Sequence, residues 1–464
     1  MSARRGIQPI MPRIIQGGLA ALLLAGVPGC AAKRPEQALR AVAEDGVTRV
    51  ELDSLTVNYE VNGLPVIQRS VYSSDVVAVQ LYLLGGVRQL TPATQGMETM
   101  LLETTEHGSA AYPKAAMRSA VGRTGSSIGY SAEVDWTVYE FHGLRQAFDS
   151  TWAVFADRLL HPTLAPADVE LVRTRLVRSA ARRRMSPASH VYYLADSLAF
   201  AGHPYALHPA GTEASLAGIT PAMLRRYHEE QLVTSRMLLV VVGNVPRATV
   251  EAAVRSSLGQ LPRGEYRWAL PDPVPPSAAR GAVLEQRAVN TNYLLGLFDG
   301  PAATSEDHAA FEVALAILSS RLFGAIREDK SLSYSASAPF MNRGLTGGGM
   351  YVSTHRPKDA VPIMREQLRR LRAEPLDAYA LRRFVEGWTL EYFYDHATSE
   401  AQAAHLARFQ LLHGDWRAGV QRMQALRAVR SSDVRTAAAR YMKDIRFAYV
   451  GDTTRVDRRE LGKF

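Results

Sequence analysis

Cysteine is nearly absent from this chain, since Cys30 is the only one among 464 residues. A single cysteine cannot form an internal disulfide, so a disulfide framework is excluded. Charge of one sign is not concentrated either: the net charge of +9 is spread along the chain, without a nucleic-acid motif or an aromatic–basic platform. Hydrophobic residues make up 47% of the sequence, which is enough for two ordinary cores at this length.

The first apolar stretch, residues 14–27, is too short for a comfortable membrane span and follows a charged segment with Arg4, Arg5 and Arg13. It ends at Val-Pro-Gly-Cys-Ala, which resembles a bacterial lipobox. We therefore expect residues 1–29 to be a lipoprotein signal peptide, Cys30 to be lipidated and 30–48 to be a tether. Ala31 resembles the pattern for outer-membrane sorting, so we expect the protein to be lipid-anchored in the bacterial cell envelope, at the outer membrane and facing the periplasm. An ordinary secretory signal with an incidental cysteine is the alternative. No uninterrupted apolar run of about 20 residues follows Cys30.

The remaining sequence predicts two α+β halves of similar outline. In the first half, Asn62-Gly63 is a strong hairpin signal, and we expect strands at 76–84, 126–130, 135–139 and 237–242 and a helix at 221–231. In the second half, we expect strands at 293–298 and 447–450 and an amphipathic helix at 306–319. Four prolines predict an extended linker at 263–280. This linker separates residues 49–262 from residues 281–464.

The segment 96–113 is the most informative one. In the insulinase and mitochondrial processing peptidase family, a Gly precedes the inverted zinc motif H-x-x-E-H, which a Gly-Thr/Ser pair and Tyr-Pro follow. The chain resembles this frame without gaps, at Gly96, Gly108, Ser109, Tyr112 and Pro113. The resemblance continues in the "NGL-V" hairpin at 62–66 and in "GHPY" at 202–205. It covers nearly all of the chain after about Arg49 and implies two homologous α/β-sandwich domains that form a clamshell.

The three chemical positions of that frame do not match. Thr99 stands in place of the first His, Leu102 in place of the general-base Glu, and Glu103 in place of the second His. The chemistry requires two imidazoles for the metal and a carboxylate that activates water. We therefore expect no catalytic residue and no metal or other cofactor on this chain.

The third zinc ligand of the family is a Glu on a later helix. In this chain the corresponding region holds no acidic residue between Glu170 and Pro187, and Glu170 would fit only after a shift of about two turns. Six arginines occupy the region instead, and Arg175, Arg178 and Arg182 share one helical stripe. This stripe is either a solvated helix face or a basic wall of a substrate chamber.

Two other candidate ligands have a simpler interpretation. Glu103, Glu106 and His107 resemble a zinc motif moved by one turn, but that shift breaks the match to the flanking Gly and Tyr-Pro landmarks. We expect Glu106 and His107 to end the helix before Gly108. His203, within "GHPY", is expected to be structural.

The second half carries a further landmark. Residues 321–334 resemble the "lRe-kgLaY" motif of the family's C-terminal domain, with Arg327 and Tyr334 at its conserved Arg and Tyr. In active members these groups hold the substrate backbone near the metal, so the resemblance implies that Arg327 and Tyr334 bind substrate. The alternative is an ordinary helix-to-strand junction.

Together these features predict a non-catalytic member of a two-chain metallopeptidase. Its partner would be a homologue with an intact H-x-x-E-H that carries the zinc, and its ligand would be a peptide. Intrinsic activity is not expected. A self-sufficient metalloendopeptidase with a divergent site and a peptide-binding or assembly scaffold without a peptidase partner are the two alternatives.

Overall fold

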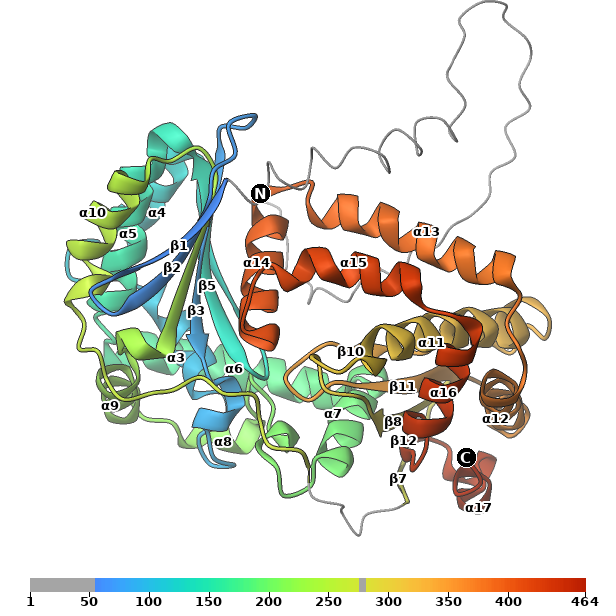
Figure 1. The fold of residues 1–464 in the computed structure, drawn as a ribbon. Helices are drawn as coiled ribbons and strands as arrows, with labels where there is room; N and C mark the ends of the chain where they lie inside the picture. Colours follow the sequence, from blue (N-terminus) through green and yellow to red (C-terminus); the bar gives the residue numbers. More distant parts are fainter. Residues whose placement is uncertain (1–54, 275–280) are drawn as a thin grey trace, which may run out of the picture. The chain divides into compact units, whose positions relative to one another are not determined.

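Two β-sheets organise the residues that this computed structural model describes, 55–274 and 281–464 (Figure 1). These residues belong to one compact unit, Asp53–Phe464. The predicted signal peptide, the lipidation site at Cys30 and the tether lie outside the described residues. The last six residues of the predicted linker, 275–280, lie outside them too.

The first sheet has six strands in the order β1-β2-β6-β3-β5-β4. Asn62 and Gly63 adopt φ angles of 50° and 82° between β1 and β2, which confirms the hairpin. The apolar run 76–84 is the central strand β3, flanked by β6 and β5. The strands are β1 (Thr56–Val61), β2 (Leu64–Arg69), β3 (Val76–Leu84), β4 (Ser127–Ala132), β5 (Trp136–Leu144) and β6 (Met237–Val242).

The helices of the first half lie between its strands along the chain, except for α10, which follows β6. The predicted helix at 221–231 is confirmed at both ends by α9, where Thr220 caps the N-terminus by accepting from the Met223 amide. The helices are α3 (Met97–Thr105), α4 (Lys114–Thr124), α5 (Phe148–Leu160), α6 (Pro166–Met185), α7 (Pro187–Ala199), α8 (Glu213–Gly218), α9 (Pro221–Gln231) and α10 (Arg247–Arg255).

The second sheet has the order β10-β11-β8-β12-β7, with β9 also paired to β11. Its strands are β7 (Ala282–Gln286), β8 (Asn292–Asp299), β9 (Ser333–Ser337), β10 (Phe340–Met341), β11 (Gly347–Thr354) and β12 (Arg446–Gly451). The helices of this half are α11 (Asp307–Leu322), η6 (Phe323–Glu328), α12 (Pro357–Ala373), α13 (Ala378–Asp395), α14 (Ser399–His413), α15 (Ala418–Ala428), α16 (Ser431–Tyr441) and α17 (Arg458–Leu461).

The two halves repeat one topology. The parallel pair β2–β6 corresponds to β7–β12, and the antiparallel neighbours β3 and β5 correspond to β8 and β11. The glycine after the last strand repeats as well. A Cβ on Gly243 would stand 2.9 Å from the Cα of Val77, and one on Gly451 would stand 2.3 Å from the Oδ1 of Asn292. The α+β fold with two homologous halves is therefore confirmed.

Each sheet is covered on one face by a helix from the other half. Helix α14 packs against β3 and β6 of the first sheet, whereas α7 packs against β8 and β12 of the second (Figure 1). The side chains that form these two layers are apolar, with Leu406 and Leu412 on α14 and Val191 and Ala195 on α7. Because each half completes the core of the other, the two halves are expected to fold together.

Helix α11 differs from the amphipathic helix predicted at 306–319. Ten of its residues are buried, because α12, α15 and α16 all pack against it. Together with η6 it is long and apolar enough to cross a membrane by length and composition, but 61% of the apolar window is buried inside the protein. It is therefore the central core helix of the second half.

The described part of the predicted linker is held by side-chain contacts. The indole of Trp268 donates to the Leu411 carbonyl at 2.8 Å, and the guanidinium of Arg88 donates to the Ala269 carbonyl at 2.8 Å. Arg88 also lies 4.8 Å from the centre of the Trp268 ring. Residues 263–274 form neither helix nor strand, and these contacts fix them on the protein surface.

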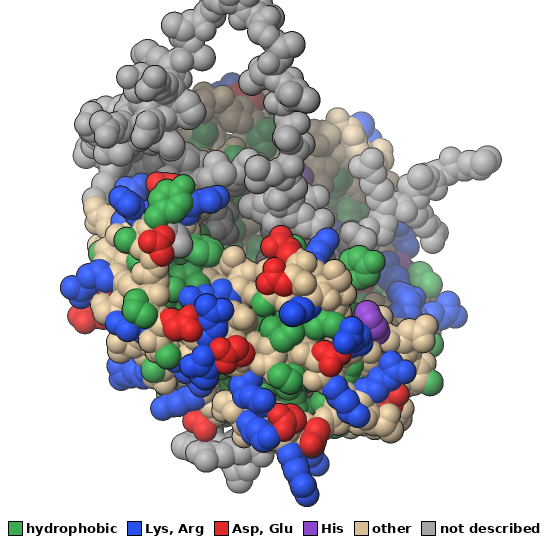
Figure 2. All heavy atoms as spheres, turned by 90° about the vertical axis from the view of Figure 1, so that its right-hand side faces the viewer, with side chains coloured by type: hydrophobic (Ala, Val, Ile, Leu, Met, Phe, Trp, Pro, Cys, Tyr) green, Lys and Arg blue, Asp and Glu red, His purple; other side chains and the backbone are tan. Residues whose placement is uncertain are grey.

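Charged side chains are mixed on the face that Figure 2 shows. Lys and Arg lie interspersed with Asp and Glu, and small apolar areas separate them. This arrangement agrees with a mildly basic surface in which many cations have a neighbouring carboxylate, such as Arg365 with Glu460 and Arg440 with Asp307.

Candidate functional site

The first candidate site lies on α3, the helix that corresponds to the zinc motif. This helix begins after Gly96, whose φ of 88° is in the left-handed region. A Cβ at this position would stand 2.8 Å from the Cα of Gly211 and 2.9 Å from a methyl group of Leu216. The glycine therefore allows α3 to start in direct contact with the segment that leads into α8.

The side chains at the three chemical positions are all engaged in other contacts. The Thr99 hydroxyl donates to the Pro209 carbonyl at 3.0 Å, and Thr99 is only 4% exposed. Leu102 is fully buried in the core of the first sheet. Glu103 accepts a hydrogen bond from Tyr130 on β4 and forms an ion pair with Arg175 on α6.

The guanidinium of Arg175 links α6 to α3 through the Glu103 carboxylate. Burial, followed by the charge of the neighbouring Glu103, raises the pKa of Tyr130 above its ordinary value, so its hydroxyl stays a donor at neutral pH. An ion pair between two helices is thus present where the family frame would have a metal ligand.

The shifted motif does not assemble a metal site either. Glu106 pairs with Arg158 at 3.1 Å. His107 is nearly buried, and its Nδ1 lies 3.0 Å from the Asp168 carboxylate and 2.8 Å from the Lys114 ammonium. Among the described residues, no group of three or more His, Cys, Asp or Glu side chains is placed to hold a metal. The residues at α3 therefore do not fit a zinc ion, which requires several donors at one point.

Glu170, the remaining candidate for the third ligand, points to solvent. It pairs with Arg173, three residues further along α6, and its side chain is 62% exposed. His203 is structural, as expected, because its Nδ1 accepts from the Tyr205 amide at 3.1 Å and caps the short helix that follows.

The arginines of α6 differ in their contacts. Arg173 donates to the Ile219 carbonyl at 2.6 Å, and Arg183 donates to the Gly211 carbonyl at 2.7 Å, so both tie α6 to the segment around α8. Arg175 is paired with Glu103, whereas Arg178 and Arg182 are exposed. The predicted stripe therefore combines one paired arginine with two solvated ones.

A second ion pair, which lies within the core, holds the start of α3. Arg236 donates to Glu98 at 2.8 Å, and the two side chains are 1% and 5% exposed. Thr137 and Tyr227 also donate to the Glu98 carboxylate, at 2.5 and 3.3 Å. Burial lowers the pKa of Arg236, but the adjacent carboxylate outweighs this and raises it overall. The helix is thus fixed by charge as well as by packing.

The second candidate site lies at the end of α11, in the π-helical turn η6. Such turns are frequent at functional sites. The guanidinium of Arg327 lies 5.0 Å from the centre of the Phe323 ring and donates to the Tyr334 carbonyl at 2.9 Å. Tyr334, at the start of β9, is 88% exposed. The structure therefore brings the predicted pair Arg327 and Tyr334 together, and their role in substrate binding stays a prediction.

Comparison with known families agrees with this geometry. Residues 66–213 match the family model described as "Insulinase (Peptidase family M16)", and residues 218–387 match the one described as "Peptidase M16 inactive domain". The two models follow one another along the chain and together include α3 and the Arg327–Tyr334 pair. The chain belongs to the insulinase family of peptidases, M16, and is a peptidase-like protein of that family.

Three known proteins illustrate the relationship. An uncharacterised zinc protease of Mycobacterium leprae is 29% identical over 229 residues, 47% of this chain and 50% of that protein. The chain spans about half the length of the curated relatives it matches. A protease from Helicobacter pylori has a similar structure, with a TM-score of 0.78 at 18% identity, over 85% of this chain and 99% of that one. A peptidase M16 inactive domain from Pseudomonas fluorescens gives a TM-score of 0.75 at 16% identity, over 86% and 98%.

The sequence does not reveal the partners of the α3 residues. Tyr130 and Arg175 lie 27 and 72 residues from Glu103, and Arg236 lies 138 residues from Glu98. No local spacing connects such pairs. The available signal is the charge itself, because a Glu within the apolar segment Met-Glu-Thr-Met-Leu-Leu requires a buried cation.

Proposed function

We propose that this chain is the non-catalytic subunit of a two-chain peptidase of the cell envelope. In this arrangement it binds peptides and presents them to a homologous partner that carries an intact H-x-x-E-H and the zinc. The chain itself supplies no metal ligand and no general base. Its α3 helix shapes the first half, and its second half supplies the peptide contact.

The state of α3 supports the non-catalytic part of the proposal. General-base catalysis requires a carboxylate that can reach a water molecule. At the corresponding position this chain has Leu102, whose side chain is fully buried. The carboxylate of Glu103 is paired with Arg175, so it is engaged with a cation of its own chain.

The Arg327–Tyr334 pair supports the peptide-binding part of the proposal. A guanidinium offers five N–H donors in a fixed plane, and the bond to the Tyr334 carbonyl uses only one of its terminal nitrogens. No carboxylate forms an ion pair with Arg327 in the described part of the chain. The tyrosine beside it is almost fully exposed. An arginine and a tyrosine that are both accessible can donate to the carbonyl groups of a bound peptide.

The lipobox at Cys30 supports the proposed location. A lipid-modified Cys30 would hold the chain at the outer membrane, facing the periplasm, and would act as a tethered end for the complex. In this proposal the lipid anchor makes the membrane contact, and the second half binds the peptide.

Reconstitution with the partner tests the proposal. The partner is the homologue with H-x-x-E-H from the same genome, and hydrolysis of a fluorogenic peptide is measured for the partner alone, for the pair and for the pair with Arg327→Ala. We expect the pair to be active and the variant to lower the rate about ten- to a thousand-fold, the scale for loss of a charged positioning contact.

Arg356→Ala is the matched control. Arg356 is an exposed arginine of the second half that pairs with Asp359 at 2.5 Å. It should leave the rate unchanged. A partner that is fully active alone, or an Arg327→Ala pair as fast as the unmodified pair, contradicts the proposal.

A further inference from the structure

A pocket of about 380 Å³ opens beside Arg327. Its volume lies in the range of sites that take a small ligand or one end of a larger one. It lies between the turn after η6, the start of β9 and the end of β11. The residues around it are Thr291, Arg327, Ser331, Leu332, Ser333, Tyr334, Ser353, Thr354 and His355.

The charge in this pocket is positive only. None of its lining residues is an Asp or a Glu, whereas Arg327 contributes a guanidinium and His355 an imidazole. Hydroxyl groups form much of the remaining wall. Those of Ser333 and Thr354 already donate to main-chain carbonyls, which leaves Thr291 and Ser331 as the candidate donors to a ligand. A pocket with a cation, hydroxyl donors and no carboxylate favours an anionic oxygen ligand.

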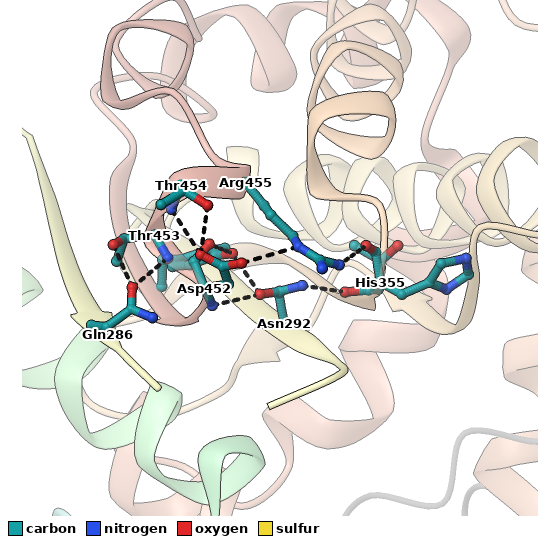
Figure 3. A network of polar contacts seen from close by, with 9 residues as sticks. Gln286, Asn292, His355, Asp452, Thr453, Thr454 and Arg455 are labelled. Carbon is teal, nitrogen blue, oxygen red and sulfur yellow. Dashed lines mark hydrogen bonds and ion pairs between the residues drawn. The ribbon is translucent and has the colours of Figure 1, made fainter. Parts of the chain in front are cut away.

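A network of polar contacts holds two residues that line the pocket, Thr354 and His355 (Figure 3). Arg455 donates to the His355 carbonyl at 3.3 Å, and Asn292 donates to the Thr354 carbonyl at 3.1 Å. Arg455 is in turn held by the Asp452 carboxylate at 3.1 Å. Figure 3 shows the imidazole of His355 pointing away from Asp452 and Arg455, so its ring is not used by the network. The walls are thus held in place before any ligand arrives, which lowers the cost of binding.

The strand that starts at the pocket can accept a further chain. Within the described residues, β9 pairs with β11 and with no other strand, so an extended peptide can add beside it. The Tyr334 carbonyl already accepts from Arg327, and the Ser335 amide and carbonyl are engaged by the Ser333 hydroxyl, so the peptide would replace some of these bonds. Strand addition at a sheet edge and capture of a C-terminal carboxylate are both recurring modes of peptide recognition.

We infer that this pocket binds the free C-terminal carboxylate of a peptide whose preceding residues lie along β9. The inference rests on the proposed peptide-binding function and specifies its ligand. Arg327 pairs with the carboxylate, and the hydroxyl groups of Thr291 and Ser331 donate to it. The chain would then select peptides by their ends, and internal segments of a folded protein would not bind.

Binding of matched peptide pools to the whole chain tests this inference. Three fluorescent pools, randomised at each position, end in a free acid, in an amide, or in an amide preceded by a fixed Glu. Fluorescence anisotropy should show about tenfold tighter binding of the free-acid pool than of the amide pool, the effect of one charge-assisted contact. The pool with the fixed Glu should bind like the amide pool.

Three variants test whether the preference for the free acid comes from the pocket or from the charge of the surface in general. Arg327→Gln should abolish the preference for the acid. Thr291→Glu adds a carboxylate at a half-exposed position and leaves Arg327 and its bond to β9 in place, so it should also remove the preference. Arg356→Gln, which removes a nearby arginine that does not line the pocket, should retain it.

Equal binding of the acid and amide pools would overturn the inference and leave peptide binding intact. Equal binding of the acid pool and the fixed-Glu pool would show that the pocket takes any carboxylate, which also overturns it. Failure of all three pools to bind would contradict the proposed function itself.

Discussion

The buried ion pair Glu98–Arg236 should be the most sensitive point of the first half. Replacing Glu98 with Ala leaves a guanidinium that is 1% exposed without its counter-charge. Breaking such a pair costs about 3–5 kcal/mol, because the remaining charge is buried and uncompensated. The hydrogen bonds from Thr137 and Tyr227 are lost as well. The free energy of unfolding of a protein is only about 5–15 kcal/mol, so Glu98→Ala should remove a large share of the stability.

Denaturant titration followed by circular dichroism measures this effect. Glu98→Gln should cost less than Glu98→Ala, because an amide oxygen in the place of Oε1 still accepts from Arg236 and Tyr227. Combining Glu98→Ala with Arg236→Met should cost less than the sum of the single changes, because neither charge then remains buried. The control is Glu230→Ala, which breaks the exposed pair with Arg226 and should leave the unfolding midpoint nearly unchanged.

Equal midpoints for Glu98→Ala and Glu230→Ala would refute this reasoning. Strict additivity of Glu98→Ala and Arg236→Met would refute it as well, since coupling between the two charges is its basis.

Two further predictions concern the chain ends and pH. Cys30→Ser should abolish lipid attachment and leave the chain unprocessed or soluble, as judged by fractionation and mass spectrometry of the N-terminus; recovery in the membrane pellet with an N-terminus cut elsewhere would contradict the lipobox. Burial, and to a lesser extent the charge of Arg183, lowers the pKa of His208 to about 4. The unfolded chain therefore binds a proton on this histidine below about pH 6.5, whereas the folded chain binds it only below about pH 4. Stability should therefore fall by about 3 kcal/mol as the pH drops through this window. His208→Asn, which keeps an acceptor for the Ala210 amide, should reduce this loss; an unchanged pH profile would contradict it.

Elements with a local signal were predictable from the sequence. The Asn62-Gly63 turn, the apolar run of β3 and the helix from Pro221 to Gln231 follow from turn chemistry, hydrophobicity and a capping Thr. The repeat of the two halves was also visible, because the strand–Gly–Asn and strand–Gly–Asp endings recur.

Features that depend on long-range packing were not predictable. Helix α11 was expected to be amphipathic, but the helices around it bury ten of its residues. Helices α7 and α14 each cover the sheet of the other half, and nothing in their own sequences indicates this. The same holds for the α3 site, where the absence of zinc ligands is visible in Thr99, Leu102 and Glu103, whereas the ion pair with Arg175 depends on how α6 packs against α3.

Zinc content is the most direct measurement of the central claim, that α3 no longer holds the family's metal. Elemental analysis of the purified chain, after dialysis against buffer with trace zinc, should give far less than one zinc per chain. Substitution of Glu103 or His107 should leave that value unchanged. Close to one zinc per chain, lost on either substitution, would contradict the claim and indicate a self-sufficient metallopeptidase with a divergent site.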